Sequence, residues 1–160
     1  MLYRDKKHLI STFIKRGDTV LDVGFLGENV SNEKDPNWTH GLIKEITEDV
    51  YGLDLQLPEK YKGNARYVAA DAGEFRFDVK FDVIFAGDLI EHLTNPGLFL
   101  ARSREHLKPG GIIIISTPNT FNLFNMVGKV MHREPVVNED HTTYFNYKTL
   151  TQLLGKCGFE

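Results

Sequence analysis

Cysteine, tryptophan and long apolar runs are scarce in this sequence. Its 160 residues include one cysteine, Cys157, and one tryptophan, Trp38. A single cysteine excludes an internal disulfide and fits a reducing cytoplasm. Apolar runs such as Ile112 to Ile115 are far too short to cross a bilayer, and the charged start, Met1 to Ser11, lacks the apolar core of a signal peptide. We therefore expect a soluble, cytoplasmic protein with no membrane partner.

An excess of charge of one sign is also missing. The formal net charge is -3 at pH 7, and the basic residues are scattered, with Lys6-Lys7 and Arg102 to Arg104 as their densest groups. Binding to a phosphate backbone needs a concentrated basic surface, so generic nucleic-acid binding is not predicted. The chain length suits one domain, residues 1–160.

Short runs rich in Val, Ile and Phe alternate with longer segments of helical period. This alternation predicts an α/β fold: a Rossmann-like, doubly wound, mostly parallel sheet with helices on both faces. The strands are expected at 19–23, 50–54, 66–70, 81–86 and 111–117, with helices around 9–14, 42–46, 96–107 and 121–131 and after Asn146. The four isoleucines of the last strand indicate burial on both of its faces.

Glycines and acids follow the first three expected strands. Ligands of an open α/β sheet bind beyond the carboxyl ends of its strands. The first strand runs through Asp22 into a turn from Gly24 to Gly27, where backbone N–H groups can approach a ligand carboxylate. Asp54 ends the second strand and can accept hydrogen bonds from ribose hydroxyls, and Asp71 after the third can accept from an adenine amine.

In this order the strand ends resemble the class I S-adenosylmethionine-dependent methyltransferases. The resemblance runs from about Thr19 to Phe159 and includes Phe81 to Phe85, Asp88 to Leu93, Leu107 to Gly111 and Ser116 to Asn119. The stretch from His141 to Phe159 is similar to the closing helix of small-molecule O-methyltransferases, a group that includes the ubiquinone-pathway enzymes.

The resemblance implies the cofactor S-adenosylmethionine and assigns residues to its parts. Gly24 and Gly27 would face the methionine part, Asp54 the ribose, Asp71 with Ala72 the adenine, and Gly87 the sulfonium. Asp22, Phe25, Leu55 and Asp88 complete the expected cofactor-binding set. The first turn departs from the family because Phe25, Leu26 and Glu28 occupy places where glycines are usual, and about thirty residues separate Gly24 from Asp54.

A candidate metal or base cluster follows the fourth strand. Asp88, Glu91 and His92 have i, i+3, i+4 spacing, which would place them on one face of a helical turn, and His141 is a fourth candidate ligand for a divalent ion. The pattern is similar to the metal site of small-RNA 2′-O-methyltransferases and of some ubiquinone-pathway enzymes. Two alternatives stay open: His92 or His141 acts as a general base, or the pattern is a packing feature.

The expected reaction is methyl transfer to a hydroxyl of a small or carbohydrate-like acceptor, whose pocket residues 121–147 would shape. A non-catalytic cofactor-binding or scaffold protein is an alternative. A nicotinamide-dependent oxidoreductase fits less well, because Gly24 to Val30 lacks the Gly-x-Gly-x-x-Gly pattern.

Chains of this resemblance continue into two further strands. We therefore expect residues 1–160 to be truncated at the C-terminus, or the edge of the fifth strand to be covered, as in a homo-oligomer.

Overall fold

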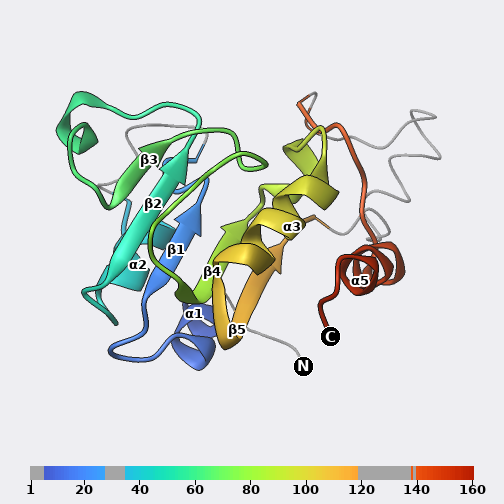
Figure 1. The fold of residues 1–160 in the computed structure, drawn as a ribbon, viewed down its shortest axis with the longest axis horizontal. Helices are drawn as coiled ribbons and strands as arrows, with labels where there is room; N and C mark the ends of the chain where they lie inside the picture. Colours follow the sequence, from blue (N-terminus) through green and yellow to red (C-terminus); the bar gives the residue numbers. More distant parts are fainter. Residues whose placement is uncertain (1–5, 28–34, 119–137, 139) are drawn as a thin grey trace.

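Five parallel strands form one sheet in the order β3-β2-β1-β4-β5 (Figure 1). The computed structural model describes residues 6–27, 35–118, 138 and 140–160. The strands are β1 (Val20–Val23), β2 (Val50–Asp54), β3 (Tyr67–Ala69), β4 (Phe81–Gly87) and β5 (Leu107–Ser116). All four strand pairs are parallel, which confirms the predicted doubly wound architecture.

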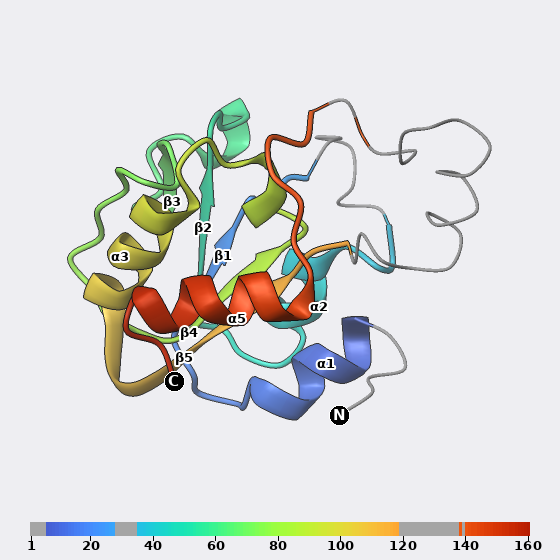
Figure 2. The same ribbon diagram turned by 90° about the vertical axis from the view of Figure 1, so that its right-hand side faces the viewer.

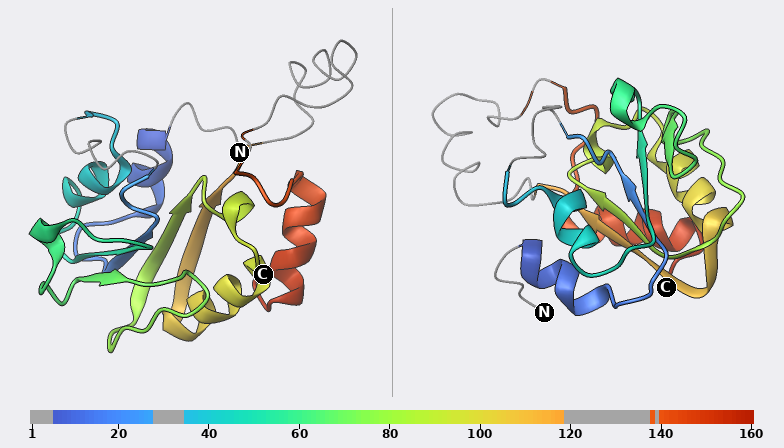
Figure 3. Two further views of the ribbon diagram at one scale, coloured as in Figure 1. Left: turned by 90° about the horizontal axis from the view of Figure 1, so that it is seen from above. Right: turned by 90° about the vertical axis from the view of Figure 1, so that its left-hand side faces the viewer.

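Helices cover both faces of the sheet, as Figures 2 and 3 show. The helices on one face are α1 (Lys6–Phe13) and α2 (Thr39–Lys44). The other face carries α3 (Pro96–His106), with α5 (Tyr147–Lys156) beside it, and two short 3-10 helices are η2 (Glu59–Tyr61) and η3 (Ile90–His92). The helix predicted at 121–131 lies outside the described residues. None of the helices in the described part of the chain has both the length and the apolar character that crossing a bilayer requires.

Two asparagines start the later helices, as their sequence positions predict. The side chain of Asn95 accepts a hydrogen bond from the Leu98 N–H at the start of α3, where Pro96 is the first helical residue. Asn146 forms a capping box with Thr149 at the start of α5. These caps satisfy backbone donors that the first turn of a helix leaves unpaired.

Residues of β1, β2, β4 and β5 enter two different apolar clusters, one on each face of the sheet. On the α1 and α2 face the cluster includes Ile10, Ile14, Val20, Leu42, Ile43, Val50, Val83, Phe85 and Ile114. On the α3 face it includes Leu21, Val23, Leu53, Phe75, Phe81, Ile84, Ala86, Phe99 and Leu100. Because β1 has neighbours on both sides and helices on both faces, all four of its residues are buried.

The fifth strand differs from the expectation in its start and its burial. It begins at Leu107, immediately after α3, and its pairing with β4 is irregular between Phe81 and Val83. Of its four isoleucines only Ile114 is buried, and Ile112 is 38% exposed. The prediction of burial on both faces is therefore wrong, because β5 ends the sheet order and packing covers its residues only in part.

Gly52, in the middle of β2, provides space for two aromatic rings. A Cβ atom at this position would lie 2.7 Å from Cδ1 of Tyr67 and 2.8 Å from Cδ1 of Phe25. Contacts this short force neighbouring atoms to move, and here those atoms belong to packed rings. The absence of a side chain at Gly52 thus allows Phe25 to fold back over the sheet.

We predict that Gly52→Ala lowers the free energy of unfolding by about 1–3 kcal/mol, the usual cost of overpacking. Urea unfolding measures the change. Gly155→Ala in α5 is the matched control: a Cβ there meets no heavy atom of the described residues within 4 Å, so helix propensity should stabilise the protein by about 0.5–1 kcal/mol. Equal effects of the two substitutions would contradict the packing argument.

Candidate functional site

Two adjoining cavities open beyond the carboxyl ends of the strands. The larger, about 530 Å³, lies towards α1 and α2, and the smaller, about 280 Å³, lies towards α3. Gly24 and His92 line both cavities. Among the predicted site residues, the larger cavity is lined by Asp22, Gly24, Phe25, Gly27, Gly87, Asp88, Glu91, His92 and His141. The smaller is lined by Gly24, Asp54, Leu55, Asp71, Ala72 and His92. The structure therefore brings the predicted residues to one edge of the sheet.

The turn after β1 begins and ends in glycines with left-handed backbone conformation. Gly24 has a φ of 74° and Gly27 a φ of 62°, angles that side-chain-bearing residues rarely adopt. Phe25 and Leu26, which stand at or near positions where the methyltransferases that the sequence resembles usually have glycines, are both buried. The departure from the glycine pattern thus places apolar side chains in the core.

Aromatic packing holds this turn against its neighbours. The Phe25 ring lies 4.8 Å from the His40 ring and 5.3 Å from the Tyr67 ring, measured between centroids. Trp38, which precedes α2, donates a hydrogen bond from Nε1 to the Phe25 carbonyl oxygen at 2.7 Å. Trp38 therefore connects the start of α2 to this turn.

Asp54 connects the end of β2 to the same turn. Its Oδ2 accepts from the Leu26 N–H at 3.0 Å, and its Oδ1 accepts from the Leu55 N–H at 2.9 Å. Burial raises the pKa of the Asp54 carboxyl, although both N–H groups stabilise its charged form. Each oxygen retains a further lone pair with which to accept a hydrogen bond from a ligand.

The smaller cavity combines an apolar surface with carboxylates. Leu55 is 70% exposed and lines this cavity, so its apolar surface is available to a ligand. Ala72 is buried beside it, and Oδ1 of Asp71 accepts from the Gly73 N–H at 2.7 Å. The cavity can therefore hold a flat apolar group with hydrogen-bond donors on its edge.

Asp22 contributes a buried carboxylate to the larger cavity. Its Oδ2 lies 3.1 Å from Nδ1 of His40, and its side chain is almost completely inaccessible to solvent. Burial raises the pKa of Asp22, and the interactions with His40 and Lys6 act in the opposite direction. A cation placed in the cavity would stabilise the charged carboxylate.

Asp88 does not lie on a helical face with Glu91 and His92, so this prediction is wrong. Its φ is 51°, and Ser116 holds it there: Asp88 N–H donates to the Ser116 carbonyl oxygen at 2.9 Å, and the Ser116 hydroxyl donates to Oδ1 at 3.1 Å. Asp88 Oδ2 pairs with Nζ of Lys6 at 3.1 Å. The carboxylate is thus held at the cavity rim, apart from the candidate metal ligands.

Glu91, His92 and His141 form the group that the sequence predicted in part. One ligand atom from each lies within 4.8 Å of the others, and the two imidazole rings are 4.6 Å apart. Both carboxylate oxygens of Glu91 are buried, with no hydrogen-bond partner among the described residues. An unpaired buried carboxylate is costly, and these three side chains could hold a cation.

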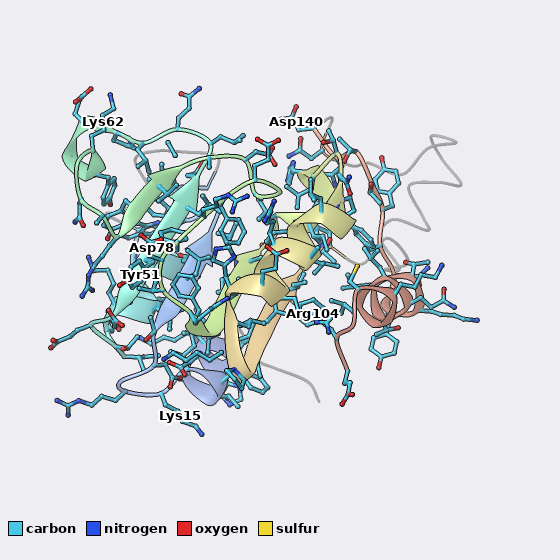
Figure 4. The ribbon with its side chains drawn as sticks, in the orientation of Figure 1. Lys15, Tyr51, Lys62, Asp78, Arg104 and Asp140 are labelled. Atoms are coloured by element: carbon cyan, nitrogen blue, oxygen red, sulfur yellow. The ribbon has the colours of Figure 1, made fainter. Side chains whose placement is uncertain are left out.

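Backbone hydrogen bonds bring His141 to the short helix η3. The Thr142 and Thr143 N–H groups both donate to the Glu91 carbonyl oxygen, at 2.9 and 3.1 Å. The Thr142 hydroxyl adds a hydrogen bond to the Leu93 carbonyl oxygen at 2.9 Å. Figure 4 labels Asp140, the residue before His141, at the edge of the molecule opposite Lys15.

Sequence reasoning missed two residues of this edge. His40, which belongs to no sequence motif, is fully buried against Asp22. Lys6 was noted only as part of a basic pair, yet it reaches Asp88 at the cavity. Neither contact has a local sequence signal, because each joins segments that are distant in the chain.

Comparison with known proteins identifies related sequences. A family model described as a methyltransferase domain matches residues 2–160. A probable S-adenosylmethionine-dependent methyltransferase of Mycolicibacterium smegmatis is 30% identical over 74% of this chain and 46% of its own length. A ubiquinone biosynthesis O-methyltransferase of Azorhizobium caulinodans is 42% identical over 37% of this chain and 21% of its own length. The chain thus spans less than half of either of these relatives.

A solved structure shares the fold. A Burkholderia thailandensis N1-methyltransferase, solved with 1,6-didemethyltoxoflavin and S-adenosylhomocysteine, has a TM-score of 0.62 and 20% identity. The match covers 96% of this chain and 65% of that one. At this identity the likeness shows a common fold.

We predict that Asp54→Asn changes how stability depends on pH. Because burial raises the pKa of Asp54 above 3.8, the native state keeps this proton to higher pH than the unfolded chain does. The contribution of Asp54 to the free energy of unfolding therefore falls as the pH rises from about 4 through the raised pKa. An asparagine side chain does not titrate in this range. The difference in free energy of unfolding between the wild type and Asp54→Asn, measured by urea unfolding, should therefore shrink from about pH 4 to pH 7.

Asp82→Asn is a control of opposite sign. Burial disfavours the charged form of Asp82, but hydrogen bonds from Lys108 and Thr19 outweigh burial and lower the pKa of its carboxyl. That stabilisation is present above the pKa that Asp82 has in the unfolded chain, and it is lost in acid. The difference in free energy of unfolding between the wild type and Asp82→Asn should therefore grow as the pH rises from about 2 to 5. Parallel pH profiles for the two variants would contradict both assignments.

Proposed function

Because this chain belongs to the methyltransferase-domain family, whose model spans residues 2–160, we propose that it binds S-adenosylmethionine and transfers its methyl group. The observation that carries the proposal is the position of Asp54 and Asp71 after neighbouring parallel strands, in one apolar cavity that adjoins a larger one. A nucleoside fits the first cavity, and the second has space for the methionine part and an acceptor. The named activity of the Mycolicibacterium relative supports this assignment.

The smaller cavity would hold the adenosine part of the cofactor. The Asp54 carboxylate, oriented by two backbone N–H groups, accepts hydrogen bonds from ribose hydroxyls. The exposed Leu55 side chain, which lines this cavity, would pack against the adenine ring. Asp71 accepts from the exocyclic amine, with the small Ala72 beside the ring.

The larger cavity would hold the methionine part. Asp22 supplies a buried negative charge for the α-ammonium group, and the Gly24 to Gly27 turn lies beside it. Gly87 leaves space at the end of β4, where a Cβ would lie 2.8 Å from the Phe85 ring. When bound, the cofactor supplies a methyl carbon activated by an adjacent sulfonium.

The acceptor would be a hydroxyl of a small or carbohydrate-like molecule. Methyl transfer requires alignment, exclusion of water and, for a hydroxyl, removal of a proton. His92 and His141 line the larger cavity and can accept that proton. The O-methyltransferase name of the Azorhizobium relative supports oxygen as the nucleophile.

We also propose a divalent ion held by Glu91, His92 and His141. The orphaned Glu91 oxygens and the two imidazoles form a mixed oxygen and nitrogen donor set within 4.8 Å, which fits such an ion. Asp88, a predicted fourth ligand, is outside this group. When bound, the ion would contact acceptor oxygens and lower the pKa of a hydroxyl.

Two alternative functions make different predictions. A non-catalytic member of the family would bind S-adenosylmethionine but show no turnover with a broad panel of acceptors. A nicotinamide-dependent enzyme is disfavoured by the family match and by a turn that lacks Gly-x-Gly-x-x-Gly.

We predict that the protein binds S-adenosylhomocysteine in calorimetric titration and that Asp54→Ala weakens binding about tenfold or more, because hydrogen bonds to a charged acceptor are lost. Asp78→Ala, at an exposed carboxylate that lines neither cavity, is the matched control and should bind like the wild type. No binding by the wild type at millimolar ligand would refute the proposed function.

We predict that Mg²⁺, Mn²⁺ or Zn²⁺ binds to the wild-type protein in calorimetric titration and that Glu91→Gln abolishes this binding. Without metal, the same variant should unfold at higher urea, because it removes an unpaired buried charge. Glu74→Gln, at an exposed position outside the group, is the control for both measurements. Metal binding that survives Glu91→Gln would contradict this site.

A further inference from the structure

We propose that His40 and Tyr67 are positioning residues, which hold the Asp22 carboxylate in place for the α-ammonium group of S-adenosylmethionine. This inference rests on the proposed function and extends it. His40 and Tyr67 line neither cavity, so they would act through Asp22.

The strand register places Asp22 and Tyr67 in one row across the sheet. Asp22 of β1 pairs with Gly52 of β2, and Gly52 pairs with Tyr67 of β3. Residues in one row of a parallel sheet project from the same face. Because Gly52 has no side chain, the space between Asp22 and Tyr67 is open to residues from outside the sheet.

His40, from α2, occupies a position that connects the two. Its Nδ1 lies 3.1 Å from Oδ2 of Asp22, and its Nε2 lies 3.2 Å from the Tyr67 hydroxyl oxygen. A hydroxyl can donate or accept, so Tyr67 pairs with Nε2 in either protonation state of the ring. Both imidazole nitrogens are therefore engaged, and the ring cannot flip without losing two hydrogen bonds.

Aromatic side chains enclose the His40 ring. Its centroid is 4.8 Å from that of Phe25, 5.2 Å from Trp38 and 5.7 Å from Tyr67. His40 is fully buried, and Asp22 is 2% exposed. A hydrogen bond in such surroundings is stronger than in water, and a buried carboxylate that lost it would be strongly destabilised.

The arrangement leaves one oxygen of Asp22 for a ligand. Among the described residues, the Asp22 side chain makes its hydrogen bond to His40 through Oδ2. Asp22 also lines the larger cavity, beside Gly24. Two other charges act nearby: Lys6 attracts the Asp22 carboxylate, and Asp54 repels it. A carboxylate fixed before binding pays less conformational entropy when it captures an ammonium group.

Two ligands separate this role from a purely structural one. S-adenosylhomocysteine carries the α-ammonium group, whereas 5′-methylthioadenosine has the same adenosine and thioether but no amino-acid part. We expect His40→Phe to weaken binding of S-adenosylhomocysteine about tenfold or more, the effect of losing a hydrogen bond to a charged group. Binding of 5′-methylthioadenosine should be unchanged.

Conservative variants keep the test valid if His40→Phe folds poorly. His40→Asn retains an N–H donor near the position of Nδ1. It should therefore bind S-adenosylhomocysteine more tightly than His40→Phe does, with the affinity for 5′-methylthioadenosine unchanged. Tyr67→Phe removes only the hydroxyl and should cause a smaller loss for S-adenosylhomocysteine alone. Tyr51→Phe makes the same chemical change on the opposite face of the sheet, where its ring packs on Phe77 and Phe81, and should change neither affinity.

Equal losses for both ligands in the His40 and Tyr67 variants would overturn the inference, because they would show a general disturbance of the site. Unchanged binding of both ligands in all three variants would overturn it as well. If the wild type binds neither ligand, the proposed function fails and the inference fails with it. A selective loss for S-adenosylhomocysteine supports the inference.

Discussion

Parallel pairing of β1 with both β2 and β4 is the constraint on which the rest of the structure depends. It buries all four residues of β1 and brings the carboxyl ends of the three central strands to one edge. The acidic and glycine residues after these strands are thereby gathered, although up to about seventy residues separate them in the chain. Most of the predicted site residues that line the two cavities lie beyond these strand ends; Asp71 and Ala72 follow β3, and His141 comes from the segment after residue 138.

The sequence predicted the parts of the fold that depend on local pattern. The bounds of β2 were predicted to the residue, and the Asn95 and Asn146 caps begin their helices as expected. Each of these features rests on residues that are close together in the chain, such as a polar cap before an apolar stripe. Strand ends rich in acids and glycine indicated the edge of the sheet at which the two cavities open.

Features that depend on distant neighbours were predicted less well. The isoleucines of β5 indicated burial, but burial depends on what lies beside the strand, and β5 ends the sheet. Helical spacing at Asp88 suggested a shared face, but pairing with Ser116 and Lys6 stabilises a left-handed conformation instead. The hydrogen-bond partners of His40 belong to two strands, so no local pattern marks them.

The docking of His141 has a consequence for how this domain can diverge. The segment is held through the carbonyl oxygens of Glu91 and Leu93, and the N–H groups of residues 142 and 143 make two of the four hydrogen bonds. Almost any amino acid can supply such N–H groups. Evolution can therefore change the composition and length of the chain between β5 and residue 138 without displacing the imidazole. Relatives that keep this backbone pairing can therefore differ in that segment and still present an imidazole at the larger cavity.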